Sequence, residues 1–337
     1  MNRHVVSPTK SHSYALAAGV AAGVLMITAL VNRRLAKKAE KDNPPEGEFI
    51  EVNGVRLHYV AQGEGKTLVL LHGNGSMIQD FESSGLINLA ARTYRVIAFD
   101  RPGYGYSERP PSTIWTPDAQ AALIHAALVR LGIKRAVVLG HSWGASVAVA
   151  LGLKFPAMVR GLILVSGYYY PTERLETTLL AGLSIPVIGD ILRYTVGPIA
   201  SRLAWPAMVR KIFGPAPTPE KFNGFPREMT FRPSQLGASE AEAAMMVPDA
   251  WAASDSYQGL KMPVVIVAGE NDRLINADSQ SGRLHSAIPH STFHRVPGAG
   301  HMVHQTATDS VMSGIEEVAR QCALQQQGVA TPHRVSA

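Results

Sequence analysis

A serine lies at the centre of the run Gly140-His141-Ser142-Trp143-Gly144. An apolar stretch precedes this run and small residues at helical spacing follow it, so the pattern predicts a strand, a sharp turn and a helix. Such a turn lifts the serine hydroxyl clear of the sheet, and the flanking glycines let neighbouring backbone pack closely. The N-terminus of the following helix would direct backbone N–H groups at developing negative charge. We therefore expect Ser142 to act as a nucleophile.

A serine needs a base and an orienting carboxylate to become a good nucleophile, and candidates for both follow later in the chain. The apolar run 264–268 leads into Glu270 and Asp272, which places two acids where a strand is expected to end. His301 lies in a glycine-rich segment after the last predicted strand. Since open α/β sheets bind ligands at the carboxyl ends of their strands, these side chains are expected to gather near Ser142. The residues alone do not decide whether Glu270 or Asp272 is the orienting acid.

The segments that must position these residues alternate between strand-like and helix-like patterns, which is typical of an α/β fold. Residues 49–52 and 55–61 flank Asn53-Gly54, a turn signal that predicts an antiparallel hairpin. A capping signal at Thr116-Pro117-Asp118 begins a helix that ends at Gly132. Apolar residues at 311, 315, 318 and 322 predict a final helix. The other expected strands are 67–71, 94–99, 136–142, 161–166, 263–269 and 292–296.

Residues 168–252 interrupt this alternation and are far too long for a simple connection. We expect them to form an inserted helical cap, which leaves residues 48–167 and 253–324 as the α/β core and 325–337 as a loose tail. Within the cap, Leu192, Val196, Ile199 and Leu203 fall on one helical face. That face must cover something apolar: the core domain, an acyl-binding tunnel or a bilayer surface.

Residues 14–31 are uncharged, mostly apolar, and long enough to cross a hydrocarbon core of about 30 Å as a helix. A cleaved signal peptide is the alternative, but Asn32-Arg33-Arg34 follows where small residues would mark a cleavage site. We therefore expect a tail at 1–13, an uncleaved transmembrane anchor at 14–31 and a solvated linker at 32–47. Positive charge is heavier after the span than before it, which favours a cytoplasmic location for the rest of the chain.

The composition limits the possible partners. With 337 residues, 46% hydrophobic and 17% charged, the chain can form one large α/β domain with an insertion. The net charge of +6 is concentrated at the chain ends, and no basic stripe interleaved with aromatics is present, so nucleic acid is not an expected partner. A single cysteine, Cys322, excludes intramolecular disulfides and falls on a core stripe. No pattern of metal ligands stands out among the twelve histidines, so we expect neither cofactor nor metal.

From about Glu48 to Cys322 the chain resembles the α/β-hydrolase superfamily. Besides the serine turn, it shows Leu-His-Gly-Asn-Gly at 71–75 and Asp-Arg-Pro-Gly-Tyr-Gly-Tyr-Ser at 100–107. The resemblance implies an α/β-hydrolase fold with a mostly parallel sheet and helices on both faces. The site that it implies has Ser142 as nucleophile, Asp272 as acid, His301 as base, and the backbone N–H groups of Asn74 and Trp143 as oxyanion hole.

The same resemblance assigns the neighbouring residues. It places the acid three residues after Gly269, which favours Asp272 over Glu270. His72 and His141 match motif positions that usually belong to the scaffold, and Asp100 is expected to hold its own glycine-rich turn. The spacing, rather than the resemblance, places His304 at the surface, because a residue three positions after His301 would face elsewhere if the loop turns into a helix.

The identity of the nucleophile narrows the chemistry. Haloalkane dehalogenases and epoxide hydrolases of this superfamily use a carboxylate, because alkylation must leave an ester that water can cleave, whereas Ser142 would form a stable ether. This matters because Asn74 and Trp143 also resemble the halide-binding pair of dehalogenases. Serine suits acyl chemistry, in which it attacks a carbonyl and the oxyanion hole stabilises the intermediate.

The sequence thus predicts a serine hydrolase that acts on a small-molecule, apolar carboxylic ester. Prolyl aminopeptidases share the Ser-Trp-Gly turn, but their Gly-Gly-Pro-Gly loop is Gly-Asn-Gly-Ser here, so amide cleavage ranks below ester cleavage. Carbon–carbon bond hydrolases and perhydrolases keep the same triad and stay open. A non-catalytic, ligand-binding member of the fold is the alternative from another class, and the three intact triad positions argue against it.

Overall fold

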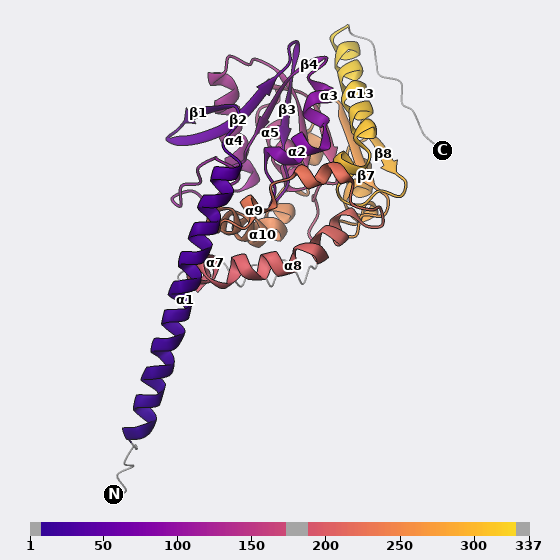
Figure 1. Ribbon diagram of the computed structural model, residues 1–337. Helices are drawn as coiled ribbons and strands as arrows, with labels where there is room; N and C mark the ends of the chain where they lie inside the picture. The colour runs from indigo at the N-terminus through magenta and orange to yellow at the C-terminus, as the bar shows by residue number, and fades with distance from the viewer. Residues whose placement is uncertain (1–7, 173–187, 328–337) are drawn as a thin grey trace, which may run out of the picture.

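The computed structural model describes residues 8–172 and 188–327, with side chains from residue 14 onwards. Parts of the expected cap (173–187), most of the expected tail (328–337) and residues 1–7 lie outside this description. The described residues form one eight-stranded sheet in the order β1-β2-β4-β3-β5-β6-β7-β8, with helices packed on it (Figure 1). The α/β class predicted from the alternating pattern is confirmed.

The sheet begins with the expected hairpin. Strands β1 (Glu48–Val52) and β2 (Val55–Gln62) pair antiparallel around Asn53 and Gly54, which both have positive φ. β2 also pairs antiparallel with β4 (Tyr94–Phe99), and the remaining neighbours are parallel. The parallel strands are β3 (Lys66–Leu71), β5 (Ala136–His141), β6 (Val159–Val165), β7 (Val264–Gly269) and β8 (Thr292–Val296).

Alternating side chains of the strands feed two separate cores. Val69 and Val138 belong to the core on one face, with residues of α4 (Pro117–Arg130) and α5 (Trp143–Lys154). Leu68 and Leu139 belong to the core on the other face, with residues of α2 (Ile78–Ser84), α3 (Leu86–Ala90) and α13 (Thr308–Gln326). The central strands are buried on both faces, which explains why they are continuously apolar in sequence.

Helices between β6 and β7 lie below the sheet in Figure 1. They are α7 (Ile188–Tyr194), α8 (Val196–Phe213), η1 (Glu220–Gly224), α9 (Arg227–Thr230) and α10 (Pro233–Ala253). The remaining short helices are η2 (Tyr257–Gly259), η3 (Asp278–Gly282), α11 (Arg283–Ala287) and α12 (Val303–Thr306). The insertion that the sequence predicts is therefore helical where it is described.

A long helix, α1 (Pro8–Asp42), contains the predicted anchor and projects from the body (Figure 1). Among the described residues it is the one helix whose length and composition would allow it to cross a membrane. It continues to Asp42, through most of the segment expected to be a solvated linker, because residues 35–42 are mostly strong helix formers and Pro44 comes only after them. Ala39 on this part is buried, and Glu40 pairs with Arg232 at 3.0 Å.

Candidate active site

The predicted serine turn has the backbone conformation that such a turn requires. Ser142 lies between β5 and α5 with φ 54° and ψ −121°, a region that non-glycine residues rarely adopt. Close packing explains both flanking glycines: a Cβ on Gly140 would lie 2.2 Å from the carbonyl oxygen of Gly144, and a Cβ on Gly144 would lie 2.2 Å from that of Leu71. The serine side chain is thereby held at the carboxyl end of β5.

His301 and Asp272 form a buried pair. Their Nδ1 and Oδ2 atoms are 2.8 Å apart, and both side chains are almost fully buried. The second oxygen of Asp272 accepts hydrogen bonds from the backbone N–H groups of Leu274 (2.7 Å) and Ile275 (2.8 Å), which fixes the carboxylate. Glu270, the other acid considered from the sequence, is exposed to solvent. The structure therefore pairs His301 with Asp272 and leaves Glu270 facing outward.

The histidine loop packs against the residue that precedes Ser142. The rings of His141 and His301 have centroids 4.9 Å apart, and Nε2 of His141 lies 3.2 Å from the carbonyl oxygen of His301. The backbone N–H of His301 donates to the carbonyl of Ile212 at the end of α8 (2.9 Å). Ser142, His301 and Asp272 thus come from the ends of three strands to one region.

The loop after β3 also reaches the serine. A Cβ on Gly73 would lie 3.0 Å from Cβ of Ser142, so this loop runs directly beside the expected nucleophile. The side chain of Asn74 is held by α10: its Nδ2 donates to the carbonyl of Ser239 (3.0 Å) and its Oδ1 accepts from the Ser239 hydroxyl (2.5 Å). Trp143 is the first residue of α5, so its backbone N–H has no acceptor within that helix. Asn74 therefore belongs to the loop beside Ser142, and Trp143 is the next residue after the serine in the chain.

A buried ion pair beside this loop could not be predicted from the sequence. The guanidinium of Arg101 contacts both oxygens of Glu242, a residue of α10, at 2.5 and 3.1 Å. Arg101 also donates to the carbonyls of His72 (2.6 Å) and Gly73 (2.9 Å). Burial alone would raise the pKa of Glu242, but the charge of Arg101 holds the pKa below its ordinary value. The pair therefore fastens the loop beside Ser142 to the helices of the insertion.

Three further polar side chains complete the set around Glu242. Hydrogen bonds reach its two oxygens from the hydroxyl of Tyr104 (2.7 Å), the amide of Gln120 (2.9 Å) and the amide of Asn74 (3.2 Å). Each donor comes from a different segment of the core. Glu242 thus serves as the common acceptor between α10 and the loops after β3 and β4.

The scaffold roles expected of two motif residues fit their contacts. His72 accepts a hydrogen bond on Nε2 from the backbone N–H of Arg101 (3.0 Å), so Nδ1 carries the proton and donates to the carbonyl of Gly73 (2.8 Å). Asp100 accepts from the backbone N–H of Tyr106 (3.0 Å) within its own turn and lies 2.6 Å from Nδ1 of His58. Both side chains are fully buried.

The expectation that His304 lies at the surface is wrong. The chain turns into α12 immediately after the histidine loop, which buries His304 against α2, where its Nε2 lies 3.0 Å from Oδ1 of Asp80. Burial would raise the pKa of Asp80, but the neighbouring His304 holds the pKa well below its ordinary range. Donor atoms of Asp80, His141 and His304 all lie within 4.8 Å of one another, in an arrangement that could hold a metal ion. Their separation in sequence gave no signal of it.

Buried histidines give the fold a pH dependence. Burial and the nearby Arg101 lower the pKa of His72 to about 4, and burial lowers the pKa of His141 well below its ordinary value. Between pH 6.5 and 4 the unfolded chain binds protons that the folded chain does not, so acidification favours unfolding. Other groups act in the opposite direction. Asp100 raises the pKa of His58 despite burial, and burial raises the pKa of Glu82 to about 7 and that of Asp249 to about 6.

We expect the free energy of unfolding to fall by roughly 2 kcal/mol between pH 7 and pH 5 from His72 alone. Urea unfolding of the full chain in detergent, followed by tryptophan fluorescence at both pH values, measures the change. The variant His72→Gln, which keeps a donor and an acceptor but cannot be protonated, should lose about 2 kcal/mol less than the unsubstituted chain over the same change of pH. An equal difference in both chains would contradict the assignment to His72.

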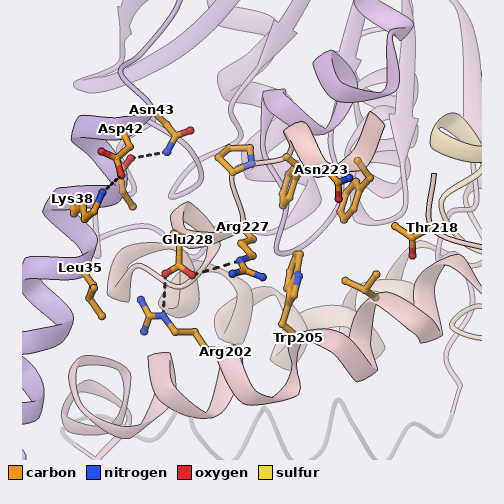
Figure 2. Close-up of a pocket in the computed structure, with 15 residues that line it drawn as sticks. Leu35, Lys38, Asp42, Asn43, Arg202, Trp205, Thr218, Asn223, Arg227 and Glu228 are labelled. Atoms are coloured by element: carbon orange, nitrogen blue, oxygen red, sulfur yellow. Dashed lines mark hydrogen bonds and ion pairs between the residues drawn. The ribbon is translucent and has the colours of Figure 1, made fainter. Parts of the chain in front are cut away.

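Two cavities are bounded by helices of the insertion. The larger, about 760 Å³, is bounded by α1, α8, η1 and α9, and its lining includes Lys38 and Asp42 on α1 and Trp205 on α8 (Figure 2). A smaller one, about 370 Å³, lies between α5 and α10 and includes Trp143 in its lining. Ser142 lines neither cavity. The aromatic floor of the larger cavity belongs to an apolar cluster that extends to Met77 and to Met302, the neighbour of His301; its buried members are Ala39, Met77, Phe213, Phe222, Phe225, Met229 and Met302.

Several known proteins are similar to this chain in sequence or in fold. A 2-hydroxy-6-oxononadienedioate/2-hydroxy-6-oxononatrienedioate hydrolase of Pseudomonas putida is 30% identical over 273 residues, which cover 76% of this chain and 87% of the relative. Haloalkane dehalogenase 2 of Mycobacterium tuberculosis is 26% identical over 81% of this chain and 95% of its own length. The solved structure of a thermophilic esterase from Thermogutta terrifontis superimposes with a TM-score of 0.67, at 20% identity, over 82% of this chain and 99% of that one.

The likeness extends to a family as a whole. Residues 66–308 match the family described as alpha/beta hydrolase fold, a range that contains every residue of the candidate site. Together with the sheet order and the serine turn between β5 and α5, this match identifies a hydrolase. The chain belongs to the α/β hydrolase fold family.

Proposed function

We propose that this protein is a membrane-anchored serine hydrolase that cleaves lipophilic carboxylic esters through an acyl-enzyme intermediate. The observation that carries the proposal is the buried His301–Asp272 pair, 2.8 Å between Nδ1 and Oδ2, held beside the strained serine turn. The carboxylate fixes the proton on Nδ1, which leaves Nε2 of His301 free to act as a base.

The reaction follows from this arrangement. Ser142 Oγ attacks the ester carbonyl carbon while Nε2 of His301 takes the hydroxyl proton, and the backbone N–H groups of Asn74 and Trp143 stabilise the oxyanion. The intermediate collapses, the alcohol leaves with the proton from His301, and the acyl group stays on Ser142. Water then attacks the acyl-enzyme with His301 again as base, which releases the acid and restores the serine.

The lipophilic character of the substrate rests on two features. The apolar cluster described above includes Met302, the neighbour of His301, and Met77, which follows the loop after β3. The apolar helix α1 would hold the enzyme at a membrane, where lipophilic esters concentrate. The excess of positive charge after the span favours a cytoplasmic location for the hydrolase domain.

A fluorophosphonate probe tests the nucleophile. The full chain in detergent should be labelled at Ser142, and Ser142→Ala should lose labelling and lower the kcat for ester hydrolysis by at least about 10⁴-fold. Ser146→Ala is the matched control. Ser146 lies on α5, four residues after Ser142, and its hydroxyl donates to the carbonyl of Tyr168. Equal labelling of Ser142→Ala and the unsubstituted chain would contradict the proposal and favour a non-catalytic member of the fold.

A series of p-nitrophenyl esters tests the substrate class. Activity should rise from acetate to octanoate, because each buried methylene adds roughly 0.8 kcal/mol of binding free energy. A preference for acetate would contradict a lipophilic acyl site while leaving the serine mechanism intact.

A second candidate, hydrolysis of a carbon–carbon bond, is favoured by the Pseudomonas putida relative, whose name gives a dioate as its substrate. A dianionic substrate requires cationic groups, and the buried Arg101 close to the serine loop is already neutralised by Glu242. Faster turnover of 2-hydroxy-6-oxononadienedioate than of any ester in the series would establish this alternative over ester cleavage.

A further inference from the structure

Helix α8 has its polar and apolar sides reversed relative to an ordinary surface helix. Every exposed residue from 191 to 209 is apolar or a tyrosine, and Leu203 is 79% exposed. A helix on a water-facing surface turns its charged side outward. The exposed members are Ile191, Tyr194, Val196, Ile199, Ala200, Leu203, Ala204, Pro206, Ala207 and Met208, and we call this set the α7–α8 outer face.

The charged residues of the same segment are turned inward. Nε of Arg202 donates to Oε2 of Glu228 on α9 at 2.9 Å, and Figure 2 shows this pair pointing into the cavity between α1 and α8. Arg193 pairs with the exposed Asp190 on α7 at 3.2 Å, and its other terminal nitrogen lies 3.8 Å from Glu240 on α10. The segment does contain charged residues, so a lack of them does not explain why the outer face is apolar. Its apolar side chains face outward while available charges are paired inside.

The position of α1 indicates what the outer face meets. Asn32, the first residue after the apolar span, is buried, and its Nδ2 donates to the carbonyls of Tyr194 (3.1 Å) and Thr195 (2.6 Å) at the junction of α7 and α8. The end of the span and the start of α8 therefore lie at one level. Figure 1 shows α8 running across the side of the body from which the apolar part of α1 projects.

Cationic side chains lie at the same level. Arg33, Arg34 and Lys37 follow the span on α1 and are exposed, and Lys38 and Lys41 continue the series. Exposed Arg210 lies near the far end of α8. Such side chains attract anionic lipid headgroups. An apolar face next to basic residues matches a helix that lies in a membrane interface.

We propose that the α7–α8 outer face is buried in the interfacial layer of the bilayer that α1 spans. The proposal rests on the proposed anchor and adds a second contact with lipid, made by the insertion itself. The occupant of the face is the lipid surface, into which a helix of this kind sinks by about 5–10 Å. This contact would also place the cavity between α1 and α8 next to lipid.

Single labelling sites in the full chain test this contact. An environment-sensitive fluorophore is attached at Leu203→Cys, at Val24→Cys in the span, and at Ile114→Cys, whose native side chain is 74% exposed and lies before α4. The unsubstituted chain, in which Cys322 is buried, sets the background. Each protein is reconstituted into phosphatidylcholine–phosphatidylglycerol vesicles that contain a lipid with a nitroxide on its acyl chain.

The expected result is strong nitroxide quenching at residues 24 and 203 and little at residue 114. Quenching at 24 without quenching at 203 would overturn the contact while leaving the anchor intact. Absence of quenching at both positions would instead contradict the anchor. A blue shift at 203 without lipid quenching would show that a second copy of the chain covers the face, which also overturns the proposal.

Discussion

Replacing Asp272 with asparagine is expected to lower kcat for ester hydrolysis about 10⁴-fold. The backbone N–H groups of Leu274 and Ile275 require an oxygen at the position of Oδ1, so the asparagine would turn its NH₂ group toward His301. Nδ1 of His301 must then accept a hydrogen bond, which moves the ring proton to Nε2, where a base is needed. Initial rates with a p-nitrophenyl ester measure the loss.

Glu270→Gln is the matched control for this prediction, because Glu270 also follows the end of β7 but is exposed. It should retain kcat within about twofold, since Glu270 is exposed and is not part of the His301–Asp272 pair. A loss in Glu270→Gln equal to that in Asp272→Asn would contradict the assignment of the acid. An unfolding midpoint for Asp272→Asn close to that of the unsubstituted chain would show that the loss is chemical.

Replacing Glu242 with alanine is expected to lower the free energy of unfolding by roughly 3–5 kcal/mol. The change leaves Arg101 buried without its partner and removes the acceptor of Tyr104, Gln120 and Asn74. The loop beside Ser142 loses its link to α10 at the same time. Urea unfolding in detergent measures the stability. The rate at which a fluorophosphonate labels Ser142 measures the effect of the loop on the reactivity of the serine.

Two variants separate charge from packing at this position. Glu242→Gln keeps the shape and one acceptor but removes the charge, so it should fall between alanine and glutamate in stability. Glu240→Gln, two residues earlier on α10, loses only a distant pairing at 3.8 Å and should cost about 1 kcal/mol or less. Equal stability of Glu242→Ala and Glu240→Gln would exclude a structural role for the buried pair.

Local patterns were sufficient to predict the strands and the serine turn. Short apolar runs such as 264–268 are typical of central strands of a parallel sheet, and Asn53-Gly54 favours its hairpin through its φ preference. The glycines at 140 and 144 carry the geometry of the turn, because any side chain there would collide with backbone. These features depend on residues that are neighbours in sequence.

Features that depend on distant pairs could not be predicted in this way. Arg101 was visible in its motif, but its partner Glu242 lies 141 residues later in a segment whose pattern indicates only a helix. His304 was misplaced because its burial depends on how α12 packs against α2, which no spacing within the loop encodes. The extension of α1 to Asp42 was missed because a charged, proline-flanked segment indicates solvent, whereas Ala39 and Glu40 pack on the body.

The hydrogen bond from the backbone N–H of His301 to Ile212 joins the base to the end of α8, and Gly300 lies against Phe213 and Gly214 of the same segment. A displacement of α8 would therefore move the imidazole. If adsorption to lipid favours one position of α8, adsorption and the alignment of His301 become coupled equilibria, and such a coupling is reciprocal. Occupancy of the serine by a phosphonate would then strengthen the hold of the protein on the lipid surface by the same factor by which lipid favours the aligned base.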